Sequence, residues 1–165
     1  MQLQDFYDYK NQLMKDILEN EAVFKLIDEN ATAETAPKLA YKQVFPCEYV
    51  PDTIEEGRTY ICFDVDVQES INDTYLIPTL FVWVFTHRSK LRLPEGGVRT
   101  DKLCSEICKM INGSMQYCLG ELNLFAVKRF APMTDYQGKV MTFSGKEFNR
   151  RYDPQKFIPA NRKKG

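Results

Sequence analysis

Two aspartates on one predicted strand are the first residues whose types and spacing suggest chemistry. Asp64 and Asp66 stand two positions apart in RTYICFDVDV, residues 58–67, so their side chains project from the same face of a strand. Paired carboxylates of this kind hold divalent metals in nucleases. The acidic-x-Lys element that would complete a PD-(D/E)xK nuclease after Pro51 and Asp52 is absent, however. A solvent-facing polar row explains the pair better, and we predict no metal here.

The cysteines and the single histidine offer two further kinds of chemistry. Cys104 and Cys108 lie one turn apart on a predicted helix and, with Cys118 or His87, have the residue types of a zinc site. Paired CxxC hooks are missing, and cysteine is commonly buried as a small apolar residue. His87 is the only candidate imidazole base, and it follows a predicted strand beside Arg88, which favours a surface role. We therefore expect no catalytic residue and no metal.

The remaining motifs and the composition set the class of protein. Neither GxGxxG nor GxxxxGK[ST] occurs, so nothing indicates a nucleotide or another cofactor. The chain has 165 residues with 44% apolar and 27% charged residues, as is typical of one soluble globular domain. Its longest apolar stretch, YLIPTLFVWVF, is too short to span a membrane, and MQLQDFYDYK does not have the pattern of a secretory signal. The five cysteines match no disulfide framework and are expected to be reduced thiols.

Hydrophobic periodicity predicts an α+β domain over residues 1–149. Apolar residues at helical spacing predict two helices between Leu3 and Ile27, broken near Asn20. A proline-containing extended connector over 31–59 leads to an antiparallel sheet of about four strands with one helix packed on it. The strands are expected at 58–67, 75–85, 122–132 and 140–148, the helix at 101–112 with Thr100 as its N-cap, and a turn at 135–139.

The first two strands carry the clearest burial patterns. Alternation along residues 58–67 predicts that one set of side chains enters the core, namely Ile61, Phe63, Val65 and Val67. Residues 75–85 form an almost continuous β-branched and aromatic run, which is typical of a central strand. Because proline cannot donate to a sheet ladder, we expect this strand to be entered just after Pro78.

Charge is unevenly distributed along the chain. Residues 150–165 contain six Lys or Arg and one Asp, so this segment is +5, whereas residues 1–149 are −6. Such a segment predicts an extended basic C-terminal arm that lies on an acidic surface of its own fold or of a neighbour. Nucleic acid is the less favoured acceptor because the acidic body repels phosphate. The arm residues expected to make contacts are Arg150, Arg151, Tyr152, Phe157, Arg162, Lys163 and Lys164.

A second candidate contact region precedes the predicted helix of residues 101–112. The segment HRSKLRLPEGG, residues 87–97, is basic and long for a connection between a strand and a helix. It is either a contact loop or a solvated loop with no partner, and the sequence leaves both interpretations open. The interface candidates in it are His87, Arg88, Lys90 and Arg92.

The order of elements, together with four stretches of sequence, resembles the tail terminator (tail completion) and neck proteins of long-tailed bacteriophages. The resemblance covers about residues 1–149. It is carried by FPCEYVPDTIEEGRTYICFDVDV at 45–67, TLFVWVFTH at 79–87, RTDKLCSEICKMIN at 99–112 and YQGKVMTFSGKEFN at 136–149. The basic arm departs from the compact ending of such proteins, and the position of this protein in the virion therefore stays open.

The resemblance implies a structural virion protein with no enzymatic activity. Such proteins form a homohexameric ring that caps the tail tube and joins it to the head connector or adaptor, with DNA passing through the lumen. This chain would then belong to the tail or neck of a virion assembled in the cytoplasm of the bacterial host. Ring formation is heterologous, so each subunit must present two different faces, and we expect the loop 87–97 and the arm 150–165 to bridge neighbours.

Three other functions remain open from the sequence. One is a head-side adaptor or connector ring. Such rings normally have a more helical core, so the two predicted β-hairpins make this function less favoured. Another is a small metal-dependent nuclease, which would need a third acidic ligand beside Asp64 and Asp66. The third is a monomeric intracellular binding module, which its oligomeric state would distinguish from a ring.

Overall fold

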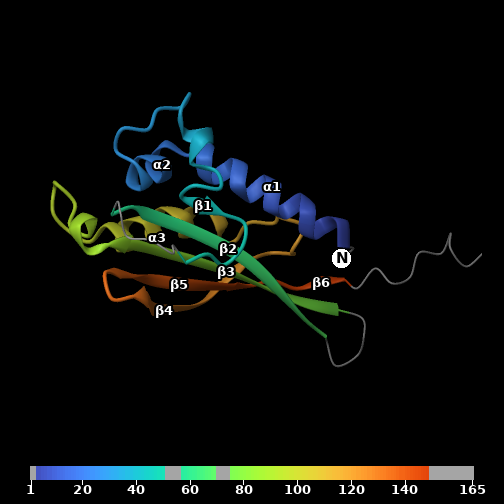
Figure 1. Ribbon diagram of the computed structural model, residues 1–165. Coiled ribbons are helices and arrows are strands. Elements are labelled where there is room, and N and C mark those ends of the chain that lie inside the picture. Colours follow the sequence, from blue (N-terminus) through green and yellow to red (C-terminus); the bar gives the residue numbers. More distant parts are fainter. Residues whose placement is uncertain (1–2, 51–56, 70–74, 149–165) are drawn as a thin grey trace, which may run out of the picture.

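Helices cover one face of a mostly antiparallel sheet (Figure 1). The computed structural model describes residues 3–50, 57–69 and 75–148. The predicted α+β class is confirmed, with helices at the N-terminus and one further helix packed on the sheet. The predicted arm of residues 150–165 lies outside the described residues.

The N-terminal helices follow the predicted periodicity. Helix α1 spans Leu3–Glu19 and α2 spans Glu21–Ile27, with the break at Asn20. Asn20 has extended backbone angles and its carbonyl accepts from the amides of Val23 and Phe24, but its side chain makes no capping bond. The apolar stripe is buried as expected, with Leu13, Ile17, Phe24 and Ile27 all inside the core.

The connector after α2 differs from the extended segment that the prolines predict. Ala36–Leu39 forms a 3₁₀ turn, in which Pro37 stands in the first turn, where its missing amide hydrogen costs nothing. Val44–Phe45 forms the short strand β1, which pairs in parallel with Ile61 and Cys62. Part of the predicted connector, residues 51–56, lies outside the described residues.

Four long strands form the sheet, in agreement with the predicted number. They are β2 (Thr59–Glu69), β3 (Tyr75–His87), β4 (Asn123–Met133) and β5 (Tyr136–Ser144), to which the short strands β1 and β6 (Glu147–Phe148) are added. The order is β1-β2-β3-β5-β4, and β6 pairs with β3. Both predicted hairpins, β2 with β3 and β4 with β5, are confirmed.

Pro78 lies inside β3 rather than before it. The strand begins at Tyr75, while pairing with β5 begins only at Thr79. The Pro78 carbonyl accepts from the Gly145 amide at 2.9 Å, so the proline faces the gap between β5 and β6. No ladder donor is needed at that gap, and a central strand therefore tolerates the proline.

The turn between β4 and β5 is earlier than predicted, at residues 134–135 instead of 135–139. Gly138 belongs to β5, opposite Phe85 of β3. A Cβ at this position would lie 1.8 Å from the carbonyl oxygen of Val84. The glycine therefore permits a close approach of two strands and does not form the turn.

Both faces of the sheet are covered at one end, which the alternation in β2 does not reveal. Ile61, Phe63 and Val65 enter the core between helices and sheet as predicted, with Val67 partly buried. Tyr60 and Cys62, on the opposite face, are also buried. They form a second cluster with residues from β1, β3, β4 and β5 and from the segment after β1, namely Phe45, Tyr49, Trp83, Phe85, Phe130, Met133 and Tyr136.

Helix α3 spans Arg99–Ile111 and contacts β3 and β5. It begins two residues before the predicted start, so Val98 and not Thr100 occupies the N-cap position. Thr100 is buried in the first turn instead. This shift places Arg99 inside the helix, where its side chain reaches α2.

Candidate functional site

The paired aspartates of β2 lie on the same face, as the spacing predicts, but among the described residues no third ligand joins them in a metal-binding group. Asp64 Oδ1 lies 3.0 Å from Lys10 Nζ of α1, and Lys10 Nζ also donates to the carbonyl of Pro46 at 2.8 Å. Within residues 3–50, 57–69 and 75–148, no three His, Cys, Asp or Glu side chains are grouped so as to hold a metal ion. Asp64 therefore fixes α1 to the sheet.

All five cysteines are free thiols, as predicted. Burial raises the pKa of the Cys62 thiol and of the Cys104 thiol to about 12 in each case. A thiol with such a pKa is almost entirely protonated at neutral pH and is a poor nucleophile or metal ligand. Both side chains act as small core residues.

His87 ends β3 and stabilises the turn that follows it. Its Nδ1 lies 2.7 Å from Ser89 Oγ and accepts from the Ser89 amide at 3.3 Å, so the imidazole caps the 3₁₀ turn Arg88–Lys90. The ring also packs edge-on against Tyr136, with 5.4 Å between centroids. These contacts give His87 a structural role at the base of the loop 87–97.

The loop 87–97 is held by hydrogen bonds within itself and to neighbouring segments. The amide of Arg88 donates to the carbonyl of Asp135 at 2.8 Å, and its guanidinium lies 3.1 Å from the Asp135 carboxylate. Further along, Arg92 forms a β-bridge with Val98, and the Leu93 amide donates to the Gly97 carbonyl at 3.1 Å. The exposed side chains of Lys90 and Arg92 are thus carried on a folded loop rather than on a loose connection.

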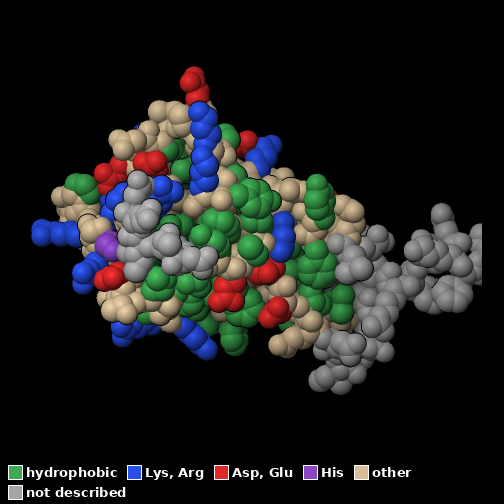
Figure 2. All heavy atoms as spheres, in the orientation of Figure 1, with side chains coloured by type: hydrophobic (Ala, Val, Ile, Leu, Met, Phe, Trp, Pro, Cys, Tyr) green, Lys and Arg blue, Asp and Glu red, His purple; other side chains and the backbone are tan. Residues whose placement is uncertain are grey.

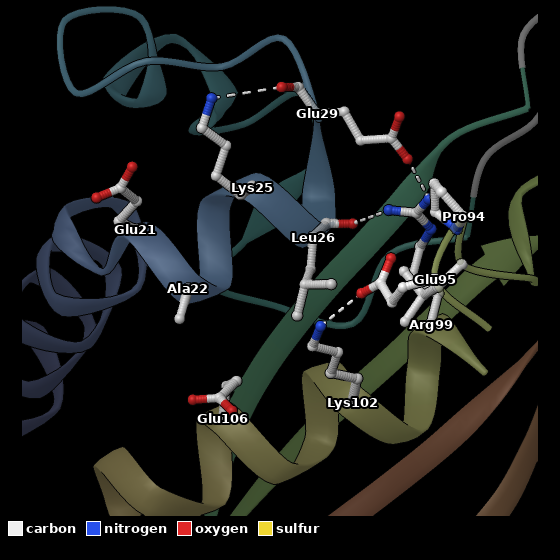
Figure 3. Close-up of a pocket in the computed structure, with 11 residues that line it drawn as sticks. Glu21, Ala22, Lys25, Leu26, Glu29, Pro94, Glu95, Arg99, Lys102 and Glu106 are labelled. Atoms are coloured by element: carbon white, nitrogen blue, oxygen red, sulfur yellow. Dashed lines mark hydrogen bonds and ion pairs between the residues drawn. The ribbon is translucent and has the colours of Figure 1, made fainter. Parts of the chain in front are cut away.

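Arg99 holds this loop against α2. Its Nε donates to the carbonyl of Lys90 at 2.8 Å and its Nη1 to the carbonyl of Leu26 at 2.9 Å, while Nη2 pairs with the Glu29 carboxylate. Figure 3 shows the guanidinium reaching from the start of α3 to Leu26 and Glu29. Arg99 is only 4% exposed. Nothing in the sequence around it indicates this role, because its partners are far away in the chain.

A shallow groove of about 470 Å³ lies between α2, α3 and the loop 87–97. Ala22, Leu26, Leu93 and Pro94 contribute apolar lining. Charged side chains from both helices surround it, and Lys102 Nζ lies 2.6 Å from the Glu95 carboxylate (Figure 3). Arg99 and Lys102, which line the groove, are paired with Glu29 and Glu95.

An exposed apolar surface lies on β4, which sequence reasoning identified only as a strand. Phe125 is 79% exposed, Val127 48% and Leu124 38%. Phe125 sits at a register shift between Leu124 and Ala126, consistent with a β-bulge. Within the described part of the chain, β4 has a strand neighbour on one side only. Together with Lys128 and Arg129, these three residues form what we call the β4 edge.

Residues 9–144 match the model of the YomW family. The chain belongs to this family. It is therefore a phage-associated protein, which agrees with the broader part of the resemblance found in the sequence. No curated protein matches the chain. Among the described residues, no helix is long and apolar enough to cross a membrane.

The YomW match includes the loop 87–97 and the β4 edge, and it ends with the last residue of β5. The two surfaces belong to different parts of the fold, since the loop packs against α2 through Arg99 and β4 forms one border of the sheet. The arm residues Arg150, Arg151, Tyr152, Phe157, Arg162, Lys163 and Lys164 lie outside both the match and the described residues. Their predicted contacts stay a prediction.

Proposed function

We propose that this YomW-family protein is a ring-forming structural component of the virion, a tail terminator or neck protein. In this role it caps the tail tube, contacts the tube protein on one side and the head connector or adaptor on the other, and lets DNA pass through its lumen. The observation that carries the proposal is the exposed apolar β4 edge of a phage-associated domain. Exposed apolar patches of this kind mark protein interaction sites.

The loop 87–97 supports a structural role in a second way. A loop held by backbone hydrogen bonds loses little conformational entropy when it binds, so it is suited to a permanent contact. Lys90 and Arg92 present positive charge on it. We expect this loop to contact a neighbouring subunit of the ring.

Removal of the gene from the phage tests the proposed function. A terminator stops tail growth and provides the joint to the head, so lysates of the deletion should contain overlong tails and filled heads without tails. Electron micrographs of wild-type, deleted and complemented lysates measure tail length and head attachment. Tails of normal length beside unattached heads would instead favour a head-side adaptor, and intact joined particles would contradict any neck role.

A further inference from the structure

The strand order places two surfaces of opposite charge at opposite borders of the sheet. The β4 edge contains Lys128 and Arg129, and no Asp or Glu occurs between Asn123 and Met133. At the other border the short strand β1 pairs with only Ile61 and Cys62 of β2. Three carboxylates lie on β2 beyond that pairing and on the segment just before residue 51, and we call them the acidic edge: Glu48, Asp64 and Asp66. Figure 2 shows acidic side chains gathered over β2 among hydrophobic ones.

The acidic edge keeps a net negative charge after its internal pairing. Lys10 offsets Asp64, whose side chain is 43% exposed. Glu48 and Asp66 are both exposed, so two carboxylates remain to attract the two cations of the β4 edge. In partly desolvated contacts, complementary charges of this kind select the partner and fix its register.

The rows of the sheet that contain the two edges overlap. Asp64 is in the same cross-strand row as Ala126 of β4, and Asp66 is in the row of Asn123. Lys128 pairs with Val140, Val140 with Trp83, and Trp83 with Cys62. Lys128 is therefore in the row of Cys62, two residues along β2 from Asp64. The charge of Glu48 contributes to the raised pKa of the Cys62 thiol, so Glu48 also lies on the Cys62 side of Asp64. A second copy displaced sideways along this row would place its β4 edge opposite the acidic edge of the first.

The β4 edge is better suited to side-chain contacts than to strand addition. Register shifts interrupt β4 between Leu124 and Ala126 and between Phe130 and Met133, and Pro132 offers no donor. Such interruptions discourage extension of the sheet by another strand. The exposure of Phe125 and Val127 nevertheless leaves apolar area that a neighbour can cover.

We propose that the β4 edge of one subunit binds the acidic edge of a second copy of this chain, head to tail. The two contact surfaces are different, so repetition of the contact builds a closed ring rather than a two-fold dimer when the rotation closes. This inference rests on the proposed ring-forming function and assigns its subunit contact. It also places the contact on residues other than the basic loop and arm.

Charge exchange between the edges tests the contact. One variant, K128E/R129E, reverses the β4 edge, and a second, E48K/D66K, reverses the acidic edge. Each alone should need at least about ten-fold higher protein concentration to assemble, since like charges then face each other. An equimolar mixture, and a chain that carries all four substitutions, should assemble like wild type. Sedimentation velocity across a concentration series gives the assembly midpoint.

The matched control is K38E/K42E, which makes the same change in net charge as K128E/R129E at two exposed lysines that belong to neither edge. It should assemble like wild type. If the control weakened assembly as much as the edge variants do, net charge alone would be responsible and the proposed contact would be wrong. The contact would also be wrong if the chain with all four substitutions failed to assemble although circular dichroism showed an intact fold. Unchanged assembly of both edge variants, together with loss of assembly on truncation after residue 149, would assign the contact to the arm.

If the wild-type chain stayed monomeric at every concentration, the proposed contact between two copies of the chain would be wrong. That result is separate from the neck role, which tail length and head attachment in lysates decide. Phe125→Ser gives a further variant, because a side chain that is 79% exposed contributes little to the fold. It should weaken assembly without a change in melting temperature, and unchanged assembly would count against the contact.

Discussion

Replacement of Arg99 by methionine should lower the free energy of unfolding by about 3 kcal/mol. Methionine keeps much of the length of the side chain but leaves the buried carbonyl of Leu26 and the partly buried carbonyl of Lys90 without their donor. Each unsatisfied carbonyl costs about 1 to 3 kcal/mol. The loop 87–97 should also become sensitive to proteases, because Arg99 ties it to α2. Urea denaturation of the wild type and the variant measures the difference.

Glu29→Gln is the control for Arg99. The Glu29 side chain is 59% exposed, so loss of its charge should cost at most about 1 kcal/mol. A small effect for Glu29 beside a large one for Arg99 would show that the backbone carbonyls are the important partners. Equal effects would show that the ion pair dominates, and an Arg99→Met protein as stable as wild type would contradict the role given to Arg99.

Gly138→Ala should prevent stable folding, with a loss of more than about 3 kcal/mol. The new Cβ would lie 1.8 Å from the Val84 carbonyl oxygen and 2.6 Å from Phe85 Cα. Both neighbours belong to the central strand β3, whose backbone cannot move without disturbing its pairing with β2. Expression level, thermal melting and urea denaturation measure the loss of stability.

Gly97→Ala is the matched control for Gly138→Ala. Gly97 has φ +89° and no atom within 4 Å of a Cβ built on it, so only its backbone angle opposes the substitution. That strain should cost about 1 kcal/mol. If both alanine variants melted at similar temperatures, the conclusion that Gly138 is required for the close approach of β3 and β5 would be wrong.

Local patterns predicted most of the fold. The stripe that includes Leu13 and Ile17 specified α1, and the alternation around Phe63 specified the buried face of β2. The glycine in DYQGK predicts a turn at Gly138, whereas in the structure it allows close packing between strands. Local sequence cannot distinguish these two uses, since the neighbouring strand decides between them.

The candidate site was less predictable than the fold. The basic loop was found from its composition, but its order depends on Arg99 and on Asp135, which are contributed by other parts of the chain. The exposure of Phe125 was also hidden, since an aromatic residue in a strand is ordinarily assigned to the core. Only the strand order, with β4 at a border, leaves it uncovered.

The mass of the full-length protein in solution tests the central claim, that this phage-associated chain forms a ring. Sedimentation velocity and native mass spectrometry should be run over a range of concentrations at low and high salt. We predict a discrete closed assembly of about six times the 19.3 kDa subunit mass, which weakens as salt screens the contact between the edges. A monomer at every concentration and at both salt levels would contradict the account.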